Sequence, residues 1–127
     1  MGRIISQLAD KETNEGMAEK LMADLFKSKT DRARIETRFM QIESYEGSHP
    51  QWTPPYKSLK MIEIRAGFSR VAVRFLCHET TDGRLVILDG CIKKGDIPTS
   101  VENRAKLRRK ELLEGKWNVR NYPLATR

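Results

Sequence analysis

Apolar and polar residues alternate along three consecutive runs in the second half of the chain, at 60–66, 69–78 and 85–94. Alternation of this kind is typical of β-strands with one buried face, because successive side chains point to opposite sides of a strand. Gly67-Phe68 separates the first two runs and Asp82-Gly83 separates the last two. Both pairs fit two-residue hairpin turns. The pattern therefore predicts three antiparallel strands joined by two tight turns.

The turns fix which residues pair, and the pairing fixes which side chains share a face. The first turn predicts the pairs Arg65–Arg70 and Ile64–Val71, and the second predicts Phe75–Gly90, Val73–Ile92 and Ala72–Lys93. The predicted apolar face consists of Ile62, Ile64, Val71, Val73, Phe75, Cys77, Val86, Leu88 and Ile92. The predicted polar face consists of Glu63, Arg65, Arg70, Ala72, Arg74, Asp89 and Lys93. Since like charges that face one another destabilise a sheet, this concentration of cations indicates an anionic ligand.

Two helices are predicted before these strands. Residues 14–27 carry Met17, Leu21 and Leu25 at helical spacing, with Met22 and Phe26 widening the stripe. Thr30 or Asp31 can cap a second helix that runs to about Ser44 and buries Ile35, Phe39 and Ile42. Residues 2–7 fit a short first strand, and 46–56 form a loop with three prolines.

A third helix is predicted after the strands. Thr99 or Ser100 can cap it, Gly115 can end it, and its narrow apolar stripe consists of Val101, Ala105 and Leu112. The expected class is α+β, with one domain over residues 1–115 and a loosely held tail over 116–127. An antiparallel sheet with helices on its apolar face leaves the polar face open to a ligand.

Composition narrows the setting and the partners. The chain has 127 residues, 39% of them hydrophobic, and a net charge of +7, which favours nucleic acid or an acidic protein as partner. No apolar run approaches the roughly 20 residues of a membrane span and no secretory signal is present, so we expect a cytoplasmic protein without a membrane partner. Cys77 and Cys91 fall on opposite predicted faces, which argues against a disulfide, and neither has the histidine spacing of a zinc site.

The run from Leu59 to Arg109 resembles the RelE/ParE toxin superfamily, in particular its phage-derived HigB-like branch. The matching positions are Arg65 at the end of the first run, Arg70 and Arg74 in the second, Lys93-Lys94 ending the third, then Pro98 and Ala105. The resemblance covers about residues 56–110. It implies a RelE-like fold, with an antiparallel sheet of three strands, or four with residues 2–7, two N-terminal helices on one face and a C-terminal helix.

The resemblance also implies a toxin of a type II toxin–antitoxin module, bound by a cognate antitoxin protein. Many such toxins enter the ribosome and cleave mRNA without a metal or other cofactor. On this basis we expect Arg65, Arg70 and Arg74 to stabilise the reacting phosphate, with His78 as the candidate for proton transfer. The residues expected to bind flanking RNA are Lys57, Lys60, Lys93, Lys94, Arg108 and Arg109.

For several residues a structural role is an alternative to a functional one. Glu63 and Asp89 could serve as bases or as partners of neighbouring arginines, and Trp52 could stack on an RNA base or pack its loop. The charged third helix could contact RNA or an acidic antitoxin segment, or be a solvated face. Tyr122 is a further candidate for proton transfer.

No histidine or tyrosine follows Lys93-Lys94 directly, where nucleases of this superfamily often carry one. Two other functions therefore stay open. The chain could be a ParE-like toxin that acts on DNA gyrase without nuclease activity, or a non-toxic relative that binds RNA.

Overall fold

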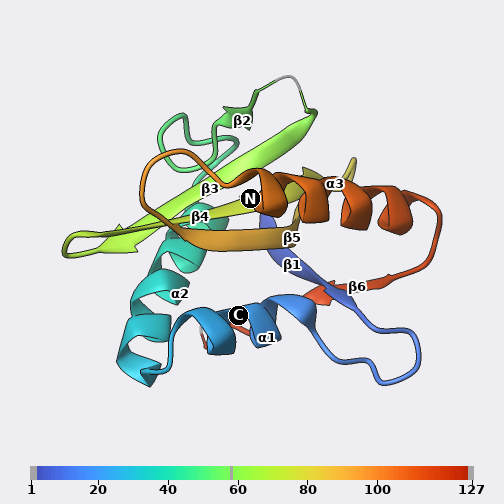
Figure 1. Ribbon diagram of the computed structural model, residues 1–127, viewed down its shortest axis with the longest axis horizontal. Coiled ribbons are helices and arrows are strands. Elements are labelled where there is room, and N and C mark those ends of the chain that lie inside the picture. Colours follow the sequence, from blue (N-terminus) through green and yellow to red (C-terminus); the bar gives the residue numbers. More distant parts are fainter. Residues whose placement is uncertain (1–2, 58, 126–127) are drawn as a thin grey trace.

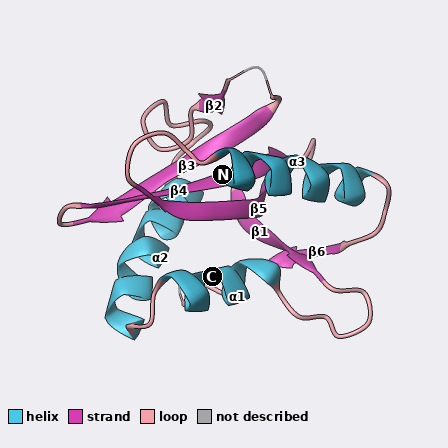
Figure 2. Cartoon of the chain, viewed as in Figure 1, coloured by secondary structure: helices cyan, strands magenta, loops and turns pink. Residues whose placement is uncertain are grey.

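The computed structural model describes residues 3–57 and 59–125. The elements in chain order are β1 (Ile4–Ala9), α1 (Met17–Leu25), α2 (Lys29–Ser44), β2 (Pro55–Tyr56), β3 (Met61–Phe68), β4 (Val71–Glu79), β5 (Arg84–Lys93), α3 (Thr99–Leu113) and β6 (Asn118–Asn121). The predicted α+β class is confirmed. Figures 1 and 2 show α1 and α2 on one side of a central sheet and α3 on the other.

Within the described residues the sheet has six strands in the order β2-β3-β4-β5-β1-β6. The prediction of a purely antiparallel sheet of three or four strands is wrong, because β1 runs parallel to β5, with Ile4 aligned on Arg84. The two N-terminal helices and strands β2–β4 lie between β1 and β5 in the chain. This long connection lets β5 run beside β1 in the same direction. β1 also spans 4–9 rather than 2–7; Gly2 lies outside the described residues.

The first hairpin turns at Ser69-Arg70, not at Gly67-Phe68 as predicted. Phe68 pairs with Val71, and Arg65 consequently pairs with Arg74 instead of Arg70. Phe68 gains a partly buried place in the core, with its ring 6.0 Å from that of Phe26. Gly67 is needed within the strand, since a Cβ there would lie 2.4 Å from the Val71 carbonyl oxygen.

The second hairpin has a three-residue loop, Thr81–Gly83, instead of two residues. The backbone N–H of Thr80 donates to the carbonyl of Arg84 across it, and Gly83 has a φ of 88°. A bulge follows, because Leu76 pairs with Asp89 while Cys77 pairs with Ile87, which leaves Leu88 without an opposite residue. The extra loop residue shifts the pairing register by one position, and the bulge shifts it back. The predicted pairs Phe75–Gly90, Val73–Ile92 and Ala72–Lys93 are therefore correct.

Each face of the sheet has its own core. The cluster beneath α1 and α2 includes Ile35, Phe39 and Ile42, as predicted for the second helix. The cluster beneath α3 contains Val101 and Ala105, as predicted for the third. Val86 and Leu88 belong to this second cluster, so their predicted place on the other face is wrong; the three-residue loop reverses the alternation before the bulge.

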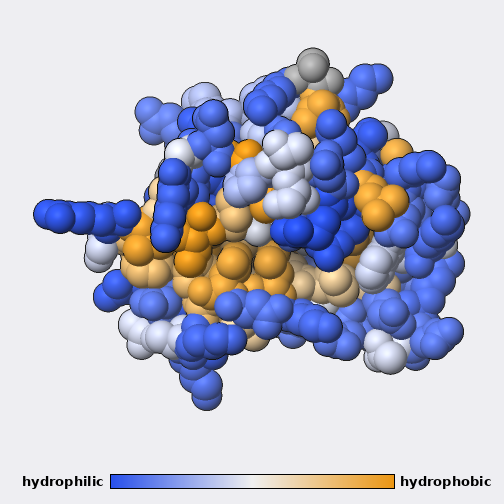
Figure 3. Space-filling model, viewed as in Figure 1, coloured by the Kyte–Doolittle hydropathy of each residue, from blue (hydrophilic) through white to orange (hydrophobic). Residues whose placement is uncertain are grey.

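The predicted open face is therefore partly covered by α3. Tyr56, Met61 and Leu76 of the sheet join the core beneath this helix. Seen from the side of Figure 3, apolar surface gathers over β5 and toward α1, and Ile92 is 38% exposed. The candidate site lies where polar residues of β3 and β4 and the end of β5 line open pockets.

Two helix starts differ from the prediction. Ser28, rather than Thr30 or Asp31, caps α2, and its hydroxyl accepts the backbone N–H groups of both residues. Pro98 occupies the N-cap of α3 without a side-chain cap, so neither Thr99 nor Ser100 caps it. Gly115 does end α3, with a φ of 79° and its N–H bonded to the carbonyl of Leu112.

The chain after α3 is part of the domain, and the prediction of a loosely held tail is wrong for its described residues. Residues 118–121 form β6 against β1, with Arg120 opposite Gln7. Tyr122 is 3% exposed and its ring lies 5.3 Å from that of Phe39. The sheet needs this segment because β1 would otherwise be an unprotected edge.

Cys77 and Cys91 are free thiols in the two different cores, which confirms that they face opposite sides of the sheet. Burial raises the pKa of both thiols. None of the helices in the described part of the chain is long and apolar enough to cross a membrane.

Candidate functional site

Arg65 and Arg74 form the centre of the polar face, side by side on β3 and β4. Glu63, two residues before Arg65 on the same face, has its side chain 6% exposed. One carboxylate oxygen lies 3.0 Å from Arg74 Nε and the other lies 3.4 Å from Arg65 Nη2. Glu63 is thus the partner of both arginines, which confirms its structural alternative.

The two arginines are held differently. The Arg74 side chain is 16% exposed, and its Nη1 donates to the carbonyl of Val73 at 2.9 Å. The Arg65 side chain is 47% exposed and its only ion pair among the described residues is the long one to Glu63. Arg65 is therefore the arginine available to a ligand, while Arg74 supports the carboxylate behind it.

A pocket of about 240 Å³ opens beside Arg65. Its cations are Lys57, Arg65 and Lys93, which come from the chain after β2, from β3 and from the end of β5. The other lining residues are Pro55, Tyr56, Glu63, Asp96 and Ile97. The lining thus holds three cations and two acids, Glu63 and the exposed Asp96, and Glu63 is engaged by two arginines. The excess of positive charge is small, but it suits an anion at Arg65 and Lys93.

Two lining residues of this pocket, Tyr56 and Lys57, are bonded to the first turn of α3. The Tyr56 hydroxyl donates to Glu102, and Lys57 Nζ lies 2.9 Å from the same carboxylate. Burial and the adjacent Glu102 raise the pKa of Tyr56, and bonds from Tyr56 and Lys57 lower the pKa of Glu102. The contact fixes the start of α3 to β2 and so fixes the pocket wall.

Asp89 anchors the middle of α3 to the sheet. It is 3% exposed, accepts from Arg104 Nε at 2.8 Å and lies 3.3 Å from Arg108 Nη1. Arg108 Nη1 also donates to the carbonyl of Leu88 at 2.8 Å. Asp89 is thus a structural ion-pair partner, and Arg108, predicted to bind RNA, holds the helix on the bulged strand.

His78 lies at the far end of β4, opposite Val86 and away from the pocket lining. Its Nδ1 accepts from Arg109 Nε at 3.2 Å, so this ring is unprotonated at that nitrogen. Burial, followed by the charge of Arg109, lowers the pKa of His78. This geometry ties His78 and Arg109 to each other instead of to Arg65.

Of the ten predicted site residues, the pocket brings together Lys57, Arg65 and Lys93, with Arg74 directly behind Arg65. Arg70 is at the exposed hairpin tip, and Lys60 and Lys94 are exposed outside the pocket lining. Tyr122 lies on the other side of the sheet, where its hydroxyl donates to Glu36 at 2.5 Å. Burial and Glu36 raise the pKa of Tyr122.

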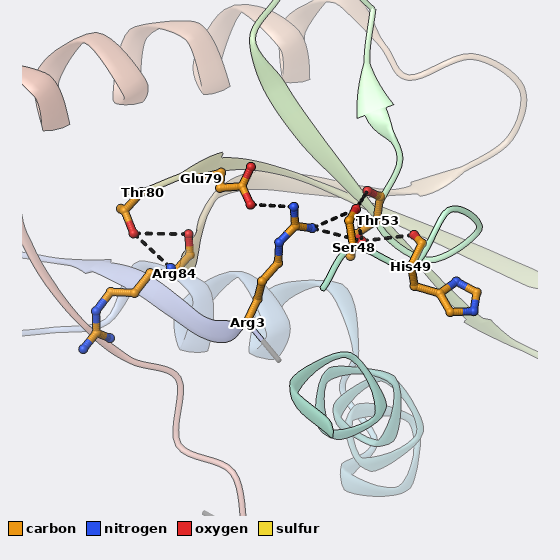
Figure 4. Close-up of polar contacts among 7 residues, drawn as sticks. All are labelled: Arg3, Ser48, His49, Thr53, Glu79, Thr80 and Arg84. Atoms are coloured by element: carbon orange, nitrogen blue, oxygen red, sulfur yellow. Dashed lines mark hydrogen bonds and ion pairs between the residues drawn. The ribbon is translucent and has the colours of Figure 1, made fainter. Parts of the chain in front are cut away.

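The sequence reasoning missed Arg3, whose side chain is 13% exposed and fastens the proline loop to the sheet (Figure 4). Its guanidinium lies 2.5 Å from Glu79 and donates to Ser48 Oγ and Thr53 Oγ1. It missed Tyr56 as well, because the partner Glu102 is 46 residues away in the chain. No pattern in the sequence indicates either contact.

No family model, no curated protein and no solved structure matches this chain.

Proposed function

We propose that this protein is a toxin of a type II toxin–antitoxin module, of the RelE/ParE kind, and that it cleaves mRNA on the ribosome. The observation that carries the proposal is the pocket in which Lys57, Arg65 and Lys93 meet beside a buried Glu63. The order of a strand, two helices, three antiparallel strands and a helix, with further short strands, supports it as well.

The pocket suits a phosphodiester that is cleaved by the neighbouring ribose. The 2′-oxygen forms a bond to phosphorus and loses its proton, while the bond from phosphorus to the 5′-oxygen breaks and that oxygen gains a proton. Negative charge accumulates on the two remaining phosphate oxygens during this step. Cations fixed in place before the reaction stabilise that charge, and the planar fork of Arg65 can donate two hydrogen bonds to it.

Arg74 and Glu63 have a positioning role in this proposal. Arg74 is bonded to the backbone and to Glu63, and Glu63 in turn lies against Arg65. Arg65 is thereby held on its strand with its end toward solvent. Lys57 and Lys93 contribute charge from the two sides of the pocket, where an RNA backbone would run.

A second candidate function, RNA binding without cleavage, is favoured by the state of the proton-transfer groups. The Tyr56 hydroxyl is bonded to Glu102, and the Glu63 carboxylate is engaged by two arginines. Cleavage requires one of them, or a group of the ribosome, to move a proton. Neutralisation by an acidic antitoxin segment over the same cations fits both candidates.

The test is inducible expression in a bacterial host, with growth and primer extension on a translated reporter mRNA. The variant is Arg65→Ala/Lys93→Ala, and the matched control is Arg70→Ala/Lys94→Ala, which removes equal charge outside the pocket. We expect growth arrest and new cuts with the wild type and the control, and neither with the pocket variant. Arrest with intact mRNA would indicate a different target such as gyrase, and no arrest would leave RNA binding alone.

A further inference from the structure

A second, more open groove of about 440 Å³ begins at Arg65 and runs away from the pocket. Arg38 of α2 and Trp52 of the proline loop form one side, and Phe68 and the β3–β4 hairpin form the other. Among the described residues, its lining includes the cations Arg38, Arg65 and Arg74 and no aspartate or glutamate. We call it the aromatic groove.

The Trp52 ring, which lines this groove, contacts both His49 and Arg38. His49 stacks on one side of its ring, with centroids 3.8 Å apart and planes at 11°. The Arg38 guanidinium carbon lies 4.6 Å from the ring centroid of Trp52. Within the described chain Arg38 has no ion-pair partner, in contrast to Arg74 of the same groove. Arg38 is thus a planar cation supported by an aromatic ring.

The stack rests on a fixed loop. The carbonyl of Trp52 accepts the backbone N–H of Arg65 at 2.8 Å, and that of Pro54 accepts the N–H of Glu63 at 2.9 Å. Arg3 ties Thr53 to β1 and β4 (Figure 4). The aromatic groove therefore has a constant position relative to Arg65.

We propose that the aromatic groove binds a nucleobase of single-stranded RNA, next to the phosphate that contacts Arg65. This inference rests on the proposed function and deepens it by assigning a site for a base. Unstacked bases bind on aromatic rings and on arginine planes, and Arg38 over Trp52 supplies such a plane. Phe68 adds apolar surface on the opposite side, and an arginine plane gives stacking with little preference for one base.

The test compares two probes of equal charge by fluorescence anisotropy at one salt concentration. One is a five-nucleotide RNA and the other is the same backbone without bases. Stacking of one base corresponds to about 1–3 kcal/mol, so we expect the wild type to bind the RNA about 5- to 150-fold more tightly than the abasic oligomer. Arg38→Ala should lose most of this ratio. Lys29→Ala removes the same charge from the exposed start of the same helix, outside the aromatic groove, and should retain the ratio.

Two further measurements separate a local effect from misfolding. Arg38→Lys keeps the charge but lacks the planar group, and we expect it to lose the ratio while its affinity for the abasic oligomer stays within about twofold of the wild type. In a Trp117→Phe background Trp52 is the one remaining tryptophan, and its emission should change with the RNA and not with the abasic oligomer.

Equal affinities for the two probes, or equal losses in Arg38→Ala and Lys29→Ala, would overturn the base site. Such a result would leave the proposed function intact if Arg65-dependent mRNA cleavage is still seen on expression. Failure of both oligomers to bind would overturn the inference and would also remove direct RNA binding from the proposed function.

Discussion

Arg65 and Arg74 face each other directly across β3 and β4, and the buried carboxylate of Glu63 lies against both. Two like charges in opposite positions destabilise a sheet, so Glu63 is what permits the pair. The same arrangement leaves the outer arginine free to contact a ligand. A stability requirement and a binding surface are thus combined in three residues.

Glu63→Gln should therefore destabilise the fold. Removing one partner of a buried ion pair leaves the other charge uncompensated, and we expect a loss of about 3–5 kcal/mol in the free energy of unfolding. Urea unfolding followed by circular dichroism measures this as a lower midpoint.

Asp96→Asn is the matched control, because Asp96 is an exposed acid on the same pocket wall. It should change the free energy of unfolding by less than about 0.5 kcal/mol. A Glu63→Gln protein as stable as the wild type would contradict the role given to this carboxylate.

Asp89→Asn should release the middle of α3. Asp89 is buried and receives Arg104 and Arg108 from that helix, so an amide leaves two cations without a carboxylate. We expect a loss of about 3–5 kcal/mol and faster hydrogen exchange in the amides of α3 than in α2.

Asp24→Asn serves for comparison, since Asp24 lines the same cleft between α1 and α3 but is exposed. It should leave the exchange of α3 unchanged. Equal protection of α3 in both variants would show that the helix is held by its apolar contacts alone.

The sequence predicts the strands and their arginine-rich face well, because alternation is a local signal. It misplaces the first turn since Gly67 looks like a turn residue, whereas the glycine is required by the nearby Val71 carbonyl. The parallel pairing of β1 with β5 and the pairing of β6 with β1 join segments some 80 and 110 residues apart, for which no local pattern exists.

The site was predicted in part for the same reason. Arg65 and Lys93 follow from the strand pattern, and both line the pocket. Arg38 was missed because it lies on the polar side of a helix whose sequence looks like any solvated face. Its contact with Trp52 arises only when the proline loop folds back on α2.

The stability of the protein should fall in mild acid because of His78. Burial and Arg109 lower the pKa of its ring in the folded state, below the usual value of about 6.5 in the unfolded state. As the pH falls below about 6.5 the unfolded chain takes up a proton that the folded chain does not, so unfolding becomes more favourable. At pH above 6.5 this effect disappears.

His78→Gln should remove this dependence. We expect the wild type to lose more stability than the variant between pH 7.5 and 5.5 in urea unfolding. The interval lies above the usual range of the carboxylates, so it isolates the histidine. His49 is present in both proteins and cancels in the comparison. Parallel pH profiles would contradict the assignment.

The segment after α3 should be essential for stability, although it follows the last predicted helix. Tyr122 is buried against Phe39 and bonded to Glu36, and its backbone N–H donates to the carbonyl of Ile5. Replacing a buried aromatic ring by alanine costs about 3–5 kcal/mol, so Tyr122→Ala should lower the melting temperature strongly. Tyr122→Phe keeps the ring and should lose only about 1–2 kcal/mol, the contribution of the hydroxyl bond. Tyr45→Ala controls for loss of a ring at a position 40% exposed, and should be milder than Tyr122→Ala. If Tyr122→Ala had the same melting temperature as the wild type, the packing of Tyr122 after β6 would not be required for the stability of the domain.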